Sequence, residues 1–93
     1  MSYSDFEEKP NIENTIYVGN IDFNVSEELL WKIFIDAGPI VNINLPKDSD
    51  NKRHKGYGFV EYDSKEGAEY ALKIYKGVKL NGRKIHINKP TKH

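Results

Sequence analysis

Short runs in which apolar and polar residues alternate predict the strands of this chain. The alternation has a period of two, and the runs are rich in β-branched and aromatic side chains, as half-buried strands are. A further short run at 78–80 is joined to the last strand by Asn81-Gly82, the dipeptide that most favours a type I′ hairpin turn. The expected strands cover residues 15–20, 40–45, 55–62 and 84–88. In the second of them the alternation places Val41, Ile43 and Leu45 on the buried face, and Asn42 and Asn44 on the other.

Apolar residues spaced three and four apart predict two helices between these strands. The first covers 27–37, with Ser26 as its N-cap and Gly38-Pro39 at its end. The second covers 65–75 and is capped by Ser64. The buried stripes comprise Leu30, Ile33, Phe34 and Ala37 in the first helix, and Ala68, Ala71, Leu72 and Tyr75 in the second.

The predicted order is strand, helix, strand, strand, helix, strand, and it occupies residues 14–90. Such a split βαβ repeat predicts an α+β, ferredoxin-like βαββαβ sandwich, in which a four-stranded antiparallel sheet carries both helices on one face. The other face of the sheet is then open to solvent. We expect residues 1–13 to be a flexible leader and 91–93 a short C-terminal tail.

The open face of this sheet is predicted to carry aromatic side chains where polar ones are expected. The alternation in the third strand places Tyr57, Phe59 and Glu61 on this face. The same logic places Tyr17 there from the first strand. Exposed flat rings suit nucleic-acid bases, because each base stacked on an aromatic side chain contributes about 1–3 kcal/mol. The sequence therefore predicts a platform for single-stranded RNA, with Gly56 and Gly58 leaving space around the rings.

Polar and basic side chains near the rings are candidate RNA contacts. Those of matching strand parity can bond to base edges or sugars, and a lysine or arginine at the rim can neutralise a phosphate. Two alternatives stay open: these side chains are simply solvated, or the face is covered by the chain's own tail or by another domain. The candidates are Asn42, Asn44, Lys84, His86 and Asn88 on the face, Lys55 beside the rings, and Lys52 and Arg53 in the preceding loop.

Two motifs resemble the RNA recognition motif (RRM) family. Residues 55–62 match every position of the family's octamer, and residues 16–21 match its hexamer. The resemblance extends over nearly all of 14–90. It implies that Tyr17 and Phe59 stack on bases, that Tyr57 packs against a base or sugar, and that Lys55 contacts a phosphate.

Residues 28–48 and 68–74 resemble a narrower group, the first RRM of the small two-RRM subunit of splicing factor 3b. This resemblance implies a nuclear protein that acts in pre-mRNA splicing. It also implies two partners, namely pre-mRNA and a larger subunit of the splicing factor 3b complex.

Large apolar side chains on the helices suggest a protein contact on the side away from the open face. Trp31 and Ile35 in the first helix, and Tyr70 and Ile74 in the second, lie outside the buried stripes, where polar residues are expected. Such residues either fold over the edge of the core or anchor a protein interface, where tryptophan and tyrosine are enriched. Whether the two pairs form one patch stays open.

The alternative function is a purely protein-binding RRM variant. Variants that bind peptides typically lose the sheet aromatics and carry Arg-x-Phe before the last strand. In this chain the aromatics are present and Arg83-Lys84-Ile85 occupies that position. The sequence therefore favours RNA binding.

Composition and charge narrow the remaining classes. The 14 basic and 14 acidic residues give a formal net charge of +0, which argues against binding nucleic acid by bulk electrostatics. Cysteine is absent and His54, His86 and His93 lack metal-site spacing, so neither a disulfide scaffold, a metal nor another cofactor is expected. No run approaches the roughly 20 apolar residues of a membrane span.

An enzyme of the same topology would resemble an acylphosphatase. That reaction requires a phosphate-cradling loop with a catalytic arginine after the first strand. This chain has Asn-Ile-Asp-Phe-Asn-Val at 20–25 instead, so no enzyme is expected.

Overall fold

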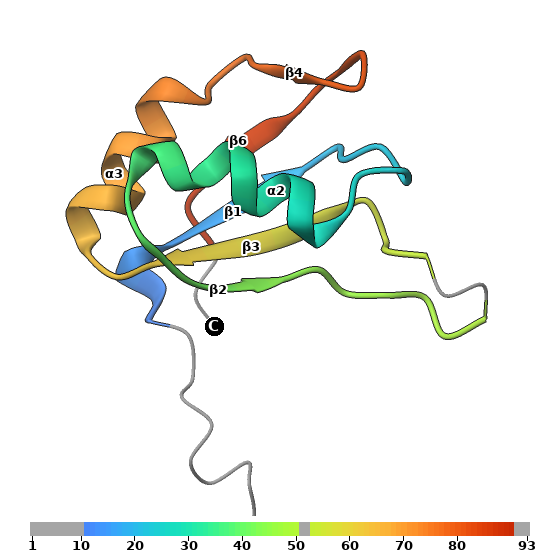
Figure 1. The fold of residues 1–93 in the computed structure, drawn as a ribbon, viewed down its shortest axis with the longest axis horizontal. Coiled ribbons are helices and arrows are strands. Elements are labelled where there is room, and N and C mark those ends of the chain that lie inside the picture. The colour runs from blue at the N-terminus through green and yellow to red at the C-terminus, as the bar shows by residue number, and fades with distance from the viewer. Residues whose placement is uncertain (1–10, 51–52, 91–93) are drawn as a thin grey trace, which may run out of the picture.

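The computed structural model describes residues 11–50 and 53–90, and its elements follow the predicted order. The strands β1, β2, β3 and β6 form an antiparallel sheet in the order β2-β3-β1-β6 (Figure 1). This confirms the predicted βαββαβ architecture. The six elements are β1 (Thr15–Gly19), α2 (Glu27–Phe34), β2 (Ile40–Asn44), β3 (Tyr57–Tyr62), α3 (Lys65–Ile74) and β6 (His86–Asn88).

Both helices pack on the same face of the sheet. Side chains of alternate strand positions, such as Ile16 and Val60, are fully buried and belong to one core cluster with Leu30 and Phe34 of α2 and Ala71 of α3. The positions between them point to the other face, which no helix of the described chain covers. The predicted division of the sheet into a core face and an open face is therefore confirmed. None of the helices in the described ranges is long and apolar enough to cross a membrane.

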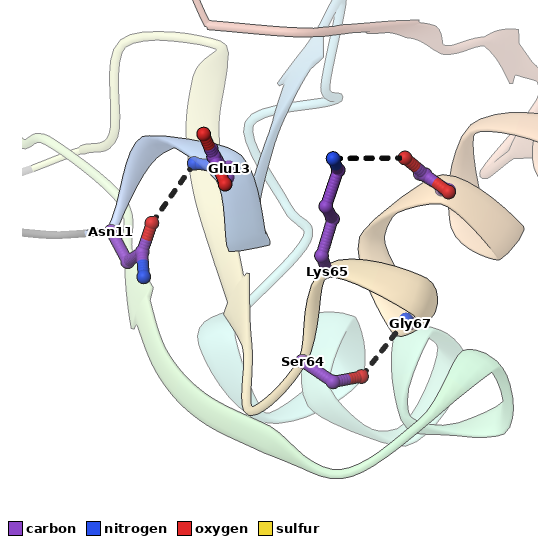
Figure 2. A network of polar contacts seen from close by, with 6 residues as sticks. Asn11, Glu13, Ser64, Lys65 and Gly67 are labelled. Atoms are coloured by element: carbon purple, nitrogen blue, oxygen red, sulfur yellow. Dashed lines mark hydrogen bonds and ion pairs between the residues drawn. The ribbon is translucent and has the colours of Figure 1, made fainter.

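Serine side chains cap both helices, as predicted. Ser26 Oγ accepts a hydrogen bond from the Leu29 N–H at 3.1 Å. Figure 2 shows the corresponding bond of the second helix, in which Ser64 Oγ accepts from the Gly67 N–H at 3.0 Å. Each bond satisfies one of the N–H groups that the first turn of a helix leaves without a partner. The first predicted helix is α-helical only to Phe34 and ends in a 3-10 turn, η2 (Ile35–Ala37).

Two buried tyrosines fasten the end of α2 to the rest of the core. The Tyr62 hydroxyl donates to the Phe34 carbonyl at 2.7 Å, and the Tyr75 hydroxyl donates to the Ile33 carbonyl. The carbonyls at the end of an α-helix often lack intrahelical partners, and these two bonds give the Phe34 and Ile33 carbonyls donors from the core. Burial also raises the pKa of both phenols. These two bonds were not predicted from the sequence.

One predicted side-chain direction in β2 is wrong. The alternation placed Val41 on the buried face together with Ile43, but Val41 is 57% exposed and Ile43 only 7%. The reason is a β-bulge: Ile40 pairs with Tyr62 and Asn42 with Glu61, so Val41 is an additional residue in its strand.

The last predicted strand is divided in two. The Asn81-Gly82 turn forms as expected, with positive φ values of 53° and 81°, which a type I′ turn requires. However, it joins β4 (Lys79–Leu80) and β5 (Arg83–Lys84), which form a separate two-stranded sheet. Only β6 continues into the main sheet.

Secondary structure is already present before residue 14, which is the predicted start of the domain. A 3-10 helix, η1 (Ile12–Asn14), precedes β1, and the Asn11 side chain accepts from the Glu13 N–H at its start (Figure 2). The Thr15 hydroxyl donates to the Asn11 carbonyl at 2.7 Å, which ties the turn to the first strand. Residues 11–13, which the sequence analysis assigned to the leader, therefore form part of the ordered domain.

Candidate nucleic-acid interface

The strand register aligns four open-face positions in one row across the sheet. Phe59 of β3 pairs with Tyr17 of β1 on one side and with Asn44 of β2 on the other. Tyr17 in turn pairs with Asn88 of β6. Since neighbouring strands lie about 4.8 Å apart, the row Asn44–Phe59–Tyr17–Asn88 places two rings in the centre with an amide at each end.

The three aromatic rings form one contiguous surface. The ring centroids of Tyr17 and Phe59 lie 5.7 Å apart, those of Tyr17 and Tyr57 6.1 Å, and those of Tyr57 and Phe59 6.0 Å. Tyr17 and Tyr57 are nearly parallel, whereas Phe59 meets both rings edge-on. These separations are typical of aromatic pairs. All three side chains are half-buried, so their free surfaces remain accessible.

Gly19 makes the position of the Tyr17 ring possible. A Cβ at residue 19 would lie 2.5 Å from Tyr17 Oη and 2.8 Å from Tyr17 Cε2, so the ring lies directly over the glycine. The expectation that Gly56 and Gly58 leave this space is wrong. A Cβ on Gly58 would instead meet the Asn44 carbonyl at 2.8 Å and Leu45 Cδ1 at 2.9 Å, on the side of β2, while Gly56 has a φ of +89° that favours glycine.

The other polar positions of the open face surround the rings. Asn42 pairs with Glu61 in one row, and His86 pairs with Gly19 in another, next to Tyr57. The side chains predicted here, Asn42, Asn44, His86 and Asn88, are all exposed. Their contacts with RNA stay predictions.

The basic residues predicted to contact RNA do not all lie on the open face of the sheet. Lys84 lies in β5, outside the main sheet, and its Cε lies 3.8 Å from the Cβ position of Gly77 in the loop after α3. It therefore does not share the open face in the way predicted, because the strand is interrupted between β5 and β6. Lys52 lies outside the described residues.

Lys55 and Arg53 lie at one end of the sheet. Both are exposed and line a hollow together with Phe23, Asp48 and His54. The predicted third strand begins two residues late, at Tyr57, because Gly56 departs from extended geometry and the Lys55 N–H donates to the Pro46 carbonyl instead. Lys55 therefore lies outside the strand whose alternation predicted its direction.

The helix-side candidates are exposed, as predicted. Trp31 is 38% exposed, Ile35 44%, Tyr70 53% and Ile74 37%. None of them is part of the buried core. Their binding to a protein stays a prediction.

Residues 16–86 match the family described as RNA recognition motif. The chain belongs to the RNA recognition motif family. The match covers both motif strands and both helices, so it includes all three platform rings.

Among similar proteins, this RRM is 51% identical to splicing factor 3B subunit 4 of Homo sapiens over 83 residues, which are 89% of this chain and 20% of the human protein. It is 40% identical to spliceosome-associated protein 49 of Schizosaccharomyces pombe over 82 residues, 88% of this chain and 24% of that protein. The chain thus spans about a fifth to a quarter of the length of these relatives. The resemblance to the small subunit of splicing factor 3b is confirmed.

Solved structures of RRM domains superpose well on this one. The RRM of RNA15 has a TM-score of 0.80 at 25% identity, covering 89% of this chain and 93% of that one. A structure described as the Rna15 RRM with bound RNA (GU) has a TM-score of 0.77 at 25% identity, covering 85% and 84% of the two chains.

Sequence reasoning missed two features that shape the interface of this RRM. Asn20, at a φ of 58°, donates from Nδ2 to the Lys84 carbonyl and accepts from Arg83 Nη2, each at 2.7 Å, and so fixes the β4–β5 hairpin next to β1. The second feature is a hollow on the open face that includes Glu61. Strand parity already indicated that Glu61 faces outward, but no sequence signal indicated the hollow.

Proposed function

We propose that this RRM binds single-stranded RNA on its open sheet face, with bases stacked on Tyr17, Tyr57 and Phe59. The observation that carries the proposal is the mutual contact of the three rings, with centroids 5.7–6.1 Å apart, on a face that no helix within residues 11–50 and 53–90 covers. Exposing three rings to water is unfavourable unless a flat apolar partner covers them. The solved RNA complex of a similar RRM supports this assignment.

Stacking supplies most of the affinity in this proposal. The chain has no net charge, and the exposed basic side chains near the platform are few. Each stacked base contributes about 1–3 kcal/mol, whereas each neutralised phosphate adds a term that salt screens. We therefore expect weak binding by the isolated domain.

Replacement of Phe59 by alanine tests the platform. We expect Phe59→Ala to weaken RNA binding by about 1–3 kcal/mol in fluorescence anisotropy titrations with short single-stranded RNAs. Tyr70→Ala is the matched control, because Tyr70 is an exposed aromatic residue on the helix side. Equal affinities of wild type and a folded Phe59→Ala variant would refute the platform.

The biological context of the proposal is pre-mRNA splicing in the nucleus. It is supported by the 51% identity to splicing factor 3B subunit 4 and by the similarity to a spliceosome-associated protein. The RNA ligand in this context is pre-mRNA. A crosslinking experiment in nuclear extract, followed by sequencing of the bound RNA, should recover intron sequences, and recovery of mature mRNA alone would contradict the context.

A second part of the proposal is a protein contact on the helix side, with a larger subunit of the splicing factor 3b complex as the partner. The observation in its favour is that Trp31 and Ile35, one turn apart on α2 and η2, are 38% and 44% exposed. Tyr70 and Ile74 on α3 are candidate contributors. The purely protein-binding alternative is not favoured, because the open-face rings are intact.

Trp31→Ala distinguishes protein binding on the helix side from RNA binding on the open sheet face. The variant should lose binding to the larger subunit's segment and keep the wild-type affinity for RNA, whereas Phe59→Ala should do the reverse. Both affinities are measured by calorimetry on the same preparations. An intact protein complex with Trp31→Ala contradicts the helix-side contact.

A further inference from the structure

A hollow beside the platform contains a carboxylate that stacking does not explain. It has a volume of about 240 Å³ and opens on the face where RNA is proposed to bind. Pockets for drug-sized ligands are about 300–1,000 Å³, so the hollow suits a single base. Its lining residues are Ile12, Thr15, Asn42, Asn44, Phe59, Glu61 and Pro90.

The hollow continues the aromatic platform toward the β2 edge of the sheet. Phe59 and Glu61 are two residues apart on β3, and β2 places Asn44 opposite Phe59 and Asn42 opposite Glu61. Residues two apart on one strand are about 6.6–6.8 Å apart, so a base stacked on Phe59 reaches Glu61 and Asn42 with its edge. The apolar Ile12 and Pro90 complete the wall.

Glu61 is the only charged residue among the described residues that line this hollow. Its Oε2 accepts the Asn11 N–H at 3.2 Å, which is the one hydrogen bond of the Glu61 side chain within residues 11–50 and 53–90. An ionised carboxylate has two oxygens and about four acceptor sites, so most of its hydrogen-bonding capacity remains. Its negative charge disfavours a phosphate at this position and favours a group that presents N–H donors.

We infer that this hollow is a guanine-selective subsite in which Glu61 and Asn42 read the Watson–Crick edge of one base. Guanine alone presents two adjacent donors, N1–H and N2–H2, which match the two oxygens of a carboxylate. Its O6 then meets the Asn42 side-chain NH2. Adenine and cytosine present one amino group beside a ring nitrogen acceptor, and uracil presents one N–H between two carbonyls, so each leaves an oxygen of Glu61 unpaired or repelled. The inference rests on the proposed RNA-binding function and adds base selectivity to it.

The experiment compares oligouridine RNAs that carry a single guanosine, inosine, adenosine or cytidine, titrated against the chain by fluorescence anisotropy. We expect wild type to bind the guanosine RNA roughly tenfold more tightly than oligouridine, as a bidentate base contact provides. Inosine lacks the N2 amino group and should lose most of this advantage. Adenosine and cytidine should show no advantage.

Glu61→Gln is the decisive variant. It keeps an acceptor for the Asn11 N–H, and it replaces one of the two side-chain oxygens that can accept from the base by an NH2 group. It also removes a negative charge, which raises the affinity for every RNA alike. The measured quantity is therefore the ratio of affinities for the guanosine RNA and oligouridine. We expect this ratio to fall to near one in Glu61→Gln, to fall in part in Asn42→Ala, and to be unchanged in Glu66→Gln, which removes an exposed carboxylate from α3 instead.

The outcomes separate this inference from the proposed function. If wild type binds all the RNAs with equal affinity and Phe59→Ala lowers the affinity for each of them, stacking on the platform is supported and the guanine subsite is refuted. If the guanosine preference persists in Glu61→Gln, the selectivity has another origin and the inference is refuted. Absence of RNA binding by the wild-type chain refutes both.

Discussion

Two glycine-to-alanine substitutions on neighbouring strands should affect different properties: Gly19→Ala should weaken RNA binding, and Gly58→Ala should lower folding stability. In Gly19→Ala the new Cβ collides with the outer atoms of the Tyr17 ring, the nearest at 2.5 Å. In Gly58→Ala it collides with the Asn44 carbonyl at 2.8 Å and with buried Leu45 at 2.9 Å. The first clash is relieved when a partly exposed side chain moves, whereas the second requires a shift of backbone and core.

The magnitudes follow from these neighbours. Gly19→Ala removes Tyr17 from the platform without overpacking the core, so RNA affinity should fall by about 1–3 kcal/mol, the contribution of one stacked base. Its folding stability should stay close to wild type. Alanine lowers the conformational entropy of the unfolded chain, which stabilises the fold by about 0.4–1 kcal/mol and offsets the cost of moving the ring. Gly58→Ala should instead lose about 1–3 kcal/mol of folding stability, as overpacked sites do.

The assay pairs urea denaturation with an RNA titration for each variant. Tyr17→Ala provides the reference, since it removes the ring itself. Gly19→Ala and Tyr17→Ala should weaken RNA binding by similar amounts, and the double variant should add little to either. Wild-type RNA affinity in Gly19→Ala, or an unfolded Gly19→Ala protein, would refute the reasoning.

Three further predictions concern stability and salt. Tyr75→Phe should lower the free energy of unfolding by about 1–3 kcal/mol, because the Ile33 carbonyl loses its donor while the ring contact with Phe34 remains; an unchanged urea midpoint contradicts this. Because burial raises the pKa of the Tyr62 and Tyr75 phenols above 10.0, the folded chain keeps protons that the unfolded chain releases. Stability should therefore be fully present below about pH 10 and fall as the pH rises further, and denaturation at a series of alkaline pH values should show a shallower fall for Tyr62→Phe. For RNA binding, two or three neutralised phosphates predict a slope of about 1.4–2.1 in log Kd against log salt, and a slope above about 4 would contradict it.

The sequence was sufficient for features that depend on local signals. The capping serines, the Asn81-Gly82 turn and the parity of β1 and β3 are each encoded within a few residues. They determine the helix starts, one hairpin and the face on which the rings lie. The platform could therefore be predicted before its geometry was known.

Features that depend on contacts between distant segments could not be predicted in this way. The space that Gly19 provides depends on the direction of the Tyr17 ring, and the hollow at Glu61 depends on η1 and Pro90 meeting β2 and β3. Lys84 was misplaced because the alternation of its strand does not reveal the division into β5 and β6. In each case the missing information is tertiary.

The predicted direction of Val41 is the error of most consequence. It arises from the bulge in β2, which one substitution tests. Ile40 and Ile43 are three residues apart, so a regular strand would direct them to opposite faces, yet Ile40 packs against the core and Ile43 is buried. The additional residue Val41 resolves this conflict and brings Asn42 to the open face opposite Glu61. Had Val41 been buried as the alternation predicted, Val41→Ser would cost about 2 kcal/mol or more, since it exchanges buried methyl groups for an unpaired hydroxyl. From its exposed position we expect a change within about 0.5 kcal/mol, whereas Ile43→Ala should cost about 2–5 kcal/mol. Urea denaturation of both variants measures the difference, and a large loss in Val41→Ser would contradict the bulge together with the guanine subsite that depends on it.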